Sequence, residues 1–382
     1  MPFFAVAAVA IAFFALERKQ VVPLLALGTA FEVVHAIGLS TQFDTPFAEA
    51  LLMAGPGLWY ASLCLSGWQA LRSEGAARLR ALDVAAIKFA LPGSVPLTMF
   101  TLWLTSQVLP QTYDSFLYAF DGLLPLPVAD MAGQIFASYT GVSQAFSAVY
   151  YSFMLVACLF MVTWGNGRLS GWLISRWIVA AVFGSGLYFV MPAVGPAVAF
   201  DAIYPHALPD PAAVPLALFP ASATGYRNAM PSLHTTWAFL IAIIAWRSGP
   251  IPRIVASMNL AATVIATLGM REHYLVDLIV AVPFTVAVHG LVSWYDAAGR
   301  RSHAAATAIG GTILTAAWLL TIRFGIGPLR GAPWMASVLV LVTMIASGWL
   351  LYRLERGAEP GATKLGRIWE RAMRTTASRP AD

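Results

Sequence analysis

Long apolar runs follow one another through most of the chain, and they constrain its fold more than any other feature. Ten runs have roughly the 17–25 residues that an α-helix needs to cross a bilayer. They cover residues 21–39, 48–71, 84–109, 145–164, 173–195, 232–247, 251–269, 274–295, 303–322 and 333–352. A shorter run, residues 2–16, is predicted as a further short or tilted span, because its charges follow it, unlike those of a signal peptide. The sequence therefore predicts an all-α polytopic membrane protein with about 10–11 transmembrane helices.

The composition leads to the same class. Hydrophobic residues make up 59% of the chain and charged residues only 11%, against about 25% charged residues in ordinary soluble domains. A chain this poor in charge cannot cover its surface in water, so the lipid bilayer is its expected partner. Soluble enzymes, disordered proteins and nucleic-acid-binding proteins are excluded, and the net charge of +5 is assigned to cytoplasmic loops.

The basic residues predict the orientation. When the loops are assigned alternately to the two faces, 19 of the 23 Lys and Arg residues lie on one face, which is therefore expected to be cytoplasmic. The other face receives only Arg227, Arg271, Arg323 and Arg330. We expect an integral protein of the inner or plasma membrane, with a basic C-terminal tail in the cytoplasm.

Two long segments on the outer face are not predicted to span the membrane. Residues 110–144 alternate apolar and acidic positions, which is typical of a half-buried helix lying in the interface. Residues 196–230 contain six prolines and little periodicity. This second segment is expected to be an ordered loop, long enough to act as a lid or to bind substrate.

Two short segments at this outer face contain the residue types needed for chemistry. One runs from Arg227 to His234 and the other from Arg271 to Asp277. His273 and Asp277 are four residues apart, so they share one face of a helix. A carboxylate in that position can accept the second N–H of the imidazole, fix its tautomer and make the other nitrogen a better nucleophile.

The surroundings of His234 favour phosphate. Pro231 is predicted at a helix start and Ser232 as its cap, so free backbone N–H groups and the helix dipole would face an anion. Arg227 and Arg271 add guanidinium groups that match phosphate oxygens. Phosphoryl transfer fits this set better than acyl transfer, for which the chain has no GxSxG motif.

These residues resemble a known family. Pro231-Ser232-Leu233-His234 resembles the PSxH motif of the type-2 phosphatidic acid phosphatase superfamily, and residues 271–277 resemble its last motif in the HYxxD form. The pair looks most like the branch of inositol phosphorylceramide and sphingomyelin synthases. Gly186-Leu187-Tyr188 through Pro192 and Gly195-Pro196 are also similar to that branch. The resemblance covers roughly residues 84–295 and implies a six-helix core there.

The resemblance implies a mechanism. His273 would attack phosphorus and form a phosphohistidine, Asp277 would orient it, and His234 would serve as acid and then base. Neither a metal nor another cofactor is expected. The superfamily's KxxxxxxRP motif is absent from this chain. Arg227, Arg271 and Ser232 are therefore predicted to bind the phosphate, and Tyr274 and Asn228 could contact substrate.

The predicted function is transfer of a phospho-headgroup from a phospholipid to a lipid or polyol acceptor. Hydrolysis of phosphatidate or a polyprenyl diphosphate is the alternative. A transporter, a metal hydrolase using His234, His273 and Asp277, and a noncatalytic scaffold are less favoured. Glu32 and His35 are either functional or internally satisfied, and His289 is predicted to be a core histidine. The predicted divisions are additional helices (1–83), the phosphotransferase-like core (84–295), two further helices (296–353) and the tail (354–382).

Overall fold

The computed structural model describes residues 18–43, 57–153, 156–157, 159–160, 167–200, 208–220, 226–296 and 300–356. The chain divides into two compact units. The first contains residues up to Pro96 together with Tyr151–Ile178 and the C-terminal tail, and the second contains Leu97–Tyr150 and Val179–Glu359. The predicted span 2–16, the tail after residue 356 and parts of the predicted spans 48–71 and 145–164 lie outside the described residues.

The first unit contains a pair of packed apolar helices. The 3-10 turn η1 (Arg18–Gln20) leads into α2 (Val21–Phe43), which packs against α4 (Gly57–Arg72). An Oε1 atom of Glu32 accepts a hydrogen bond from the Gly57 backbone N–H at 3.1 Å. This contact favours the internally satisfied alternative for Glu32, whereas the side chain of His35 lies outside the described residues.

Two long helices contribute residues to both units. The 34-residue helix α5 (Gly75–Val108) begins nine residues before the predicted span at 84, because the polar segment that precedes the span continues the helix. Helix α10 spans Gly167–Val190.

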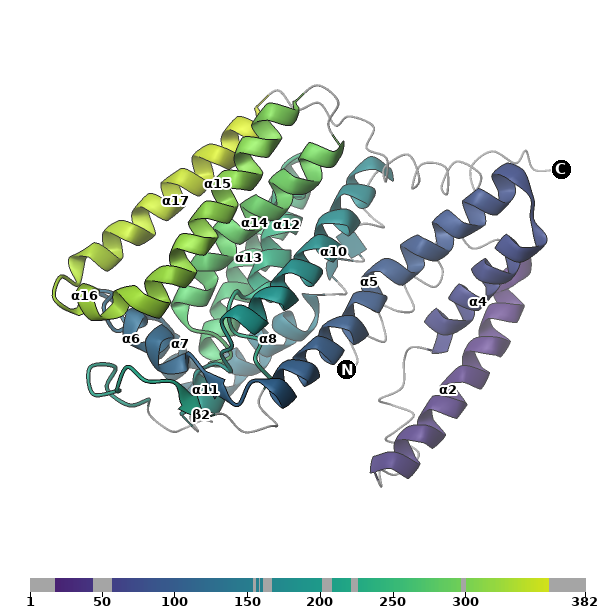
Figure 1. Cartoon of the computed structure of the whole chain (residues 1–382). Helices are drawn as coiled ribbons and strands as arrows, with labels where there is room; N and C mark the ends of the chain where they lie inside the picture. Colours follow the sequence, from purple (N-terminus) through teal and green to yellow (C-terminus); the bar gives the residue numbers. More distant parts are fainter. Residues whose placement is uncertain are drawn as a thin grey trace. The chain divides into compact units, whose positions relative to one another are not determined.

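The second unit is a bundle of membrane-type helices (Figure 1). Helix α14 packs against α12, α15 and α17, while α13 packs against α12. The π-helical turn η2 links α15 to α16. The bounds are α12 (Leu233–Ala245), α13 (Pro250–Gly269), α14 (Leu275–Asp296), α15 (Arg301–Leu320), η2 (Thr321–Gly325), α16 (Ile326–Arg330) and α17 (Trp334–Glu355).

The helical membrane fold predicted from the apolar runs is confirmed. Five of the described helical segments are long and apolar enough to cross a bilayer. They are Gly171–Val190, Pro250–Gly269, Leu275–Tyr295, Arg301–Arg330 and Trp334–Glu355. Val21–Val34 and Leu233–Ala245 are shorter apolar helices, and the larger number of spans read from the sequence stays a prediction.

Short elements cover one end of the second unit, which we call the loop end. They are α6 (Asp114–Asp121), α7 (Val128–Ser138), α8 (Thr140–Tyr151), α11 (Pro196–Ala199) and the strands β1 (Gln111–Thr112) and β2 (Phe219–Pro220). The expectation of one interfacial helix over 110–144 was wrong. Pro125 and Pro127 lie between α6 and α7, where the missing N–H groups and the ring of proline disfavour a continuous helix.

The predicted loop 196–230 lies at the loop end and is partly described. It contains α11 and β2, and β2 pairs antiparallel with β1, so Gln111 faces Pro220 and Thr112 faces Phe219. Residues 201–207 and 221–225 of this loop lie outside the described residues.

A hydrophobic cluster fixes the loop end to the bundle. Leu117 and Phe120 of α6 are fully buried, and they belong to one cluster with Val276 and Val280 of α14 and Trp318 of α15. The Phe120 ring meets the Trp318 ring edge to face at 5.1 Å. Burial of these aromatic and aliphatic side chains stabilises the packing of α6 against α14 and α15.

Candidate active site

His273 lies immediately before α14, in the tight loop that connects α13 to α14, and is 1% exposed. Its Nδ1 is 2.9 Å from the Ala229 carbonyl oxygen and 3.5 Å from Oδ2 of Asp277. A carbonyl can only accept, so Nδ1 carries the proton. Within the described residues its Nε2 has no hydrogen-bond partner, which leaves this nitrogen with a lone pair for chemistry.

The predicted contact between His273 and Asp277 is present but is not the shortest one. Asp277 lies in the first turn of α14, and its Oδ2 accepts the Tyr274 backbone N–H at 2.8 Å. The carboxylate therefore serves both the helix start and the imidazole, while the nearer acceptor for the imidazole is the Ala229 carbonyl.

His234 lies in the first turn of α12, at the same loop end as His273. Ser232 is the N-cap and accepts the Thr235 backbone N–H, which confirms its predicted capping role. Pro231 precedes this cap instead of starting the helix, because α12 begins at Leu233. The imidazole of His234 stacks on the Tyr150 ring at 4.0 Å, and it is close enough to His273 for the two to interact electrostatically.

Arg271 is held beside His273 in an uncommon backbone conformation. Its φ of 58° is in the left-handed region, which few residues other than glycine adopt. The side chain is 5% exposed, and one terminal nitrogen lies 3.5 Å from Oδ1 of Asp130 on α7. A Cβ at Gly133 would come within 2.7 Å of Nε of Arg271, so the glycine leaves room for the guanidinium.

Asp114 connects three parts of the loop end. Its carboxylate accepts the backbone N–H groups of Val194 and Gly195, at 3.1 and 2.9 Å, and the Tyr274 hydroxyl at 2.8 Å. Burial raises the pKa of Asp114 to about 6, although these hydrogen bonds oppose the shift. Tyr274, predicted as a possible substrate contact, is fully buried and anchored by this bond.

Asp121 caps α14. Its two carboxylate oxygens accept the backbone N–H groups of Leu275 and Val276, at 2.6 and 3.0 Å. Burial raises the pKa of Asp121 to about 8, with the nearby Asp277 adding to the shift. Sequence analysis missed this role and that of Asp114. The acidic positions of 110–144 were visible, but their partners lie about 80 to 160 residues away.

Arg227, the other predicted phosphate ligand, is fully buried and bonds a backbone carbonyl. Its Nε and one terminal nitrogen donate to the Leu109 carbonyl oxygen, at 3.1 and 2.8 Å. The contact fastens the segment before α12 to the end of α5. Asn228, the adjacent predicted contact residue, is half-buried, and its contact with substrate stays a prediction.

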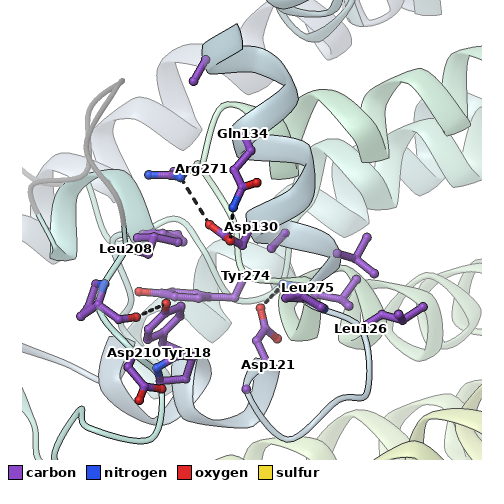
Figure 2. A pocket seen from close by; sticks show the side chains of 18 residues that line it. Tyr118, Asp121, Leu126, Asp130, Gln134, Leu208, Asp210, Arg271, Tyr274 and Leu275 are labelled. Carbon is purple, nitrogen blue, oxygen red and sulfur yellow. Dashed lines mark hydrogen bonds and ion pairs between the residues drawn. The ribbon is translucent and has the colours of Figure 1, made fainter.

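A cavity of about 380 Å³ opens beside Arg271 and Tyr274 (Figure 2). Its wall comes from α6 and its following loop, α7, Pro196, residues 208–211 and the start of α14. Figure 2 shows the Arg271 side chain pointing toward Asp130, with the Gln134 amide on the same carboxylate. The volume falls within the range of ordinary small-molecule sites.

The arrangement suits nucleophilic and acid–base chemistry on a phosphate. It provides the His273 imidazole, whose Nε2 has no hydrogen bond among the described residues, with a second imidazole, that of His234, nearby. Arg271 lies two residues before His273 in the chain. Among the residues that the structure describes, no group of three or more His, Cys, Asp or Glu side chains is placed to hold a metal ion.

One comparison with known proteins finds a match over this region. No curated protein and no solved structure matches the chain. Residues 115–291, however, match the family model of the PAP2 superfamily. The matched segment begins in α6 and ends in α14, so it includes both histidines, Asp277 and Arg271, and also Asp121 and Asp130 of the loop end. The match therefore supports the PAP2 superfamily, a family of phosphatases and phosphotransferases with a helical membrane fold, as the family of this segment.

Proposed function

We propose that the chain is a metal-independent membrane lipid phosphotransferase or phosphatase that forms a phosphohistidine on Nε2 of His273. The observation that carries this proposal is the environment of that imidazole. The Nδ1 proton is directed to Ala229 and Asp277, and Nε2 has no bond among the described residues. A buried imidazole that carries its proton on Nδ1 in this way has the tautomer that a nucleophile needs.

The proposed reaction has two chemical steps. In the first step His234 begins as the protonated imidazolium. Nε2 of His273 attacks phosphorus while the bond from phosphorus to the leaving oxygen breaks, and His234 donates its proton to that oxygen. His234, now neutral, removes a proton from the acceptor, whose oxygen attacks phosphorus and breaks the P–N bond. Asp277 stabilises the positive charge that develops on His273 during both steps.

Arg271 is our proposed principal phosphate ligand. It is buried, lines the cavity and is two residues from the nucleophile. Backbone N–H groups in the first turn of α12, next to Ser232, would add the donors that phosphate prefers. Arg227, with two nitrogens on the Leu109 carbonyl, would contribute to phosphate binding mainly by holding the segment before α12 in place.

We propose transfer of a phospho-headgroup to an alcohol as the reaction, with plain hydrolysis of a lipid phosphate as the alternative. The motif form Met-Pro-Ser-Leu-His with His-Tyr-x-x-Asp supports transfer. The excess of basic residues in the opposite loops supports an active site on the extracytoplasmic face, in an inner or plasma membrane.

The decisive experiment is a screen of phospholipid substrates with the purified protein and two matched variants. His273→Ala should abolish turnover, whereas His303→Ala, at the other end of the bundle, should leave it unchanged. A substrate labelled at phosphorus should place label on His273 of the wild-type protein. A protein that turns over without any labelled histidine would refute the nucleophile assignment.

Products of the same screen separate transfer from hydrolysis. Transfer predicts that added alcohol acceptors are consumed and that little free phosphate or headgroup phosphate appears. If water were used as fast as any alcohol, the hydrolytic alternative would be correct.

A further inference from the structure

The cavity beside Arg271 has an unusual charge pattern for a phosphate site. The residues that line it include three carboxylates, Asp121, Asp130 and Asp210, and one guanidinium, that of Arg271. Burial raises the pKa of Asp121 to about 8, so Asp130 and Asp210 are the charged groups that would repel a phosphate dianion in this cavity. The cavity is therefore better suited to a ligand that has positive or donor groups as well as phosphate.

The three carboxylates are not equally available. Asp121 uses both oxygens to cap α14. Asp210 is exposed, and one of its oxygens accepts the Ala212 backbone N–H. Asp130 is 37% exposed, faces Arg271 at 3.5 Å and accepts a bond from Gln134 through its other oxygen. Asp130 and Asp210 are thus the acceptors that a ligand in the cavity can reach.

Arg271 and Asp130 form an ion pair that a bound substrate could break. A separation of 3.5 Å is a loose ion pair, and the carboxylate is the more exposed partner. A phosphate that binds the guanidinium would displace Asp130 from it. The released carboxylate would then need a donor, which the group attached to the phosphate could supply.

We propose that this cavity binds the headgroup of a phosphodiester lipid, with the phosphate on Arg271 and hydroxyl or ammonium donors of the headgroup on Asp130 and Asp210. The inference rests on the proposed function and adds its substrate class. Donor-bearing phosphodiesters are the substrates, and phosphomonoesters such as phosphatidate are disfavoured. The extra negative charge of a monoester would meet both aspartates and gain no donor contact.

The test compares lipids with identical acyl chains and different headgroups. Phosphatidylglycerol offers hydroxyls, phosphatidylethanolamine offers an ammonium, phosphatidylmethanol is a diester without donors, and phosphatidate is a monoester. With the full-length protein we expect kcat/KM for at least one donor-bearing lipid to exceed that for phosphatidylmethanol and phosphatidate by about tenfold or more. Which of the two donor lipids is preferred distinguishes hydroxyl from ammonium recognition.

Asp130→Asn and Asp210→Asn should each reduce this preference severalfold, and Asp130→Asn should also improve relative use of phosphatidate. Glu74→Gln, an exposed carboxylate outside the cavity, is the matched control and should change nothing. Asp210→Asn keeps the test valid if Asp130→Asn fails to fold. Equal use of all four lipids, or a preference that both aspartate variants retain, would overturn the inference.

Binding separates this inference from the proposed reaction. Lipid binding by His273→Ala should show the same headgroup preference without turnover. A preference in binding by a protein that never turns over would sustain the cavity assignment and refute the reaction. Turnover without any headgroup preference would support the proposed reaction and refute the cavity assignment.

Discussion

The N–H of His273 has two possible acceptors, and their distances decide what Asp277 contributes. The Ala229 carbonyl is at 2.9 Å and the Asp277 carboxylate at 3.5 Å. In a serine-protease triad the aspartate alone holds the tautomer, and its replacement by Asn costs about 10⁴-fold because the tautomer is lost. Here the backbone carbonyl is the nearer acceptor, so it holds the same tautomer when the Asp277 carboxylate is removed.

Asp277→Asn should therefore reduce kcat by about 10²-fold, well short of the loss in His273→Ala, because charge stabilisation is lost and the tautomer is kept. The measurement is single-turnover kinetics on the best lipid substrate, with Ser302→Ala, on the exposed far end of α15, as control. A loss as complete as that of His273→Ala would show that the carboxylate, not the carbonyl, orients the imidazole.

At this scale the sequence predicts the reactive side chains better than their supports. His234, His273 and Asp277 could be proposed because motif spacing and helix parity bring their segments to one face. The Ala229 carbonyl is 44 residues from His273, and Asp114 is 160 residues from Tyr274. No local pattern reports a partner at such separations, so the capping roles of Asp114 and Asp121 required the folded chain.

At the scale of elements, the turn after α10 fits against the loop that holds Arg271. Gly195 has a φ of 86°, and a Cβ there would come within 2.2 Å of the Glu272 carbonyl oxygen. The Ala197 backbone N–H donates to the Arg271 carbonyl at 2.9 Å, and Asp114 binds the Gly195 N–H. Only a residue without a side chain allows this approach.

Gly195→Ala should therefore prevent correct folding or lower the melting temperature of the solubilised protein sharply, since it combines a backbone clash with an unfavourable φ. Gly186→Ala in α10 is the matched control, because a Cβ there has nothing within 4 Å. It should be neutral or slightly stabilising. A Gly195→Ala protein as stable as the control would mean that the two loops do not pack in this way.

The two helices that begin at the histidines are also joined at their other ends. Glu355 of α17 bonds Arg247, which follows α12, through Oε2 at 2.7 Å to Nε. Its Oε1 is 2.8 Å from Nε2 of His289 on α14. His289 is fully buried, as the sequence predicts for a core histidine. One carboxylate thus connects three helices at the end of the bundle opposite the site.

Glu355→Gln should destabilise the protein by about 1.5–3 kcal/mol, the range for hydrogen bonds to charged groups, because it leaves Arg247 and His289 without a carboxylate. Thermal unfolding in detergent measures the effect. Arg353→Gln, an exposed position on the same helix, should have little effect, because interactions of exposed charges contribute little to stability. If both variants melted together with wild type, the connection would carry no stability.

At the scale of the whole chain, the basic residues fall into two groups, four arginines predicted on the outer face and 19 residues predicted on the cytoplasmic face. The four assigned to the outer face by the sequence all contact the loop end. Arg227 bonds Leu109, Arg271 faces Asp130, Arg323 lies over the Tyr113 ring at 5.4 Å, and Arg330 donates to the Val214 carbonyl at 3.2 Å. Each of the four therefore contacts the loop end, which fits their separation from the 19 basic residues that are predicted to be cytoplasmic.

The helical class and most helix positions could be predicted because apolar length alone determines them. The arrangement of the short elements at the loop end could not, because prolines and distant carboxylates decide where α6 and α7 begin and end. Orientation in the membrane depends on charge bias and not on contacts within the fold.

Orientation is directly testable with two single-cysteine proteins in a background in which Cys64 and Cys158 are replaced by serine. Ala212→Cys places a thiol on an exposed position of the loop end, and Ser302→Cys places one at the start of α15, at the opposite end. A membrane-impermeant maleimide added to intact cells should label the first and not the second, since 19 of the 23 basic residues predict that the second end is cytoplasmic. Both should react after the membrane is permeabilised. The reverse pattern would place the histidines in the cytoplasm, where the donor and acceptor lipids would be those of the inner leaflet.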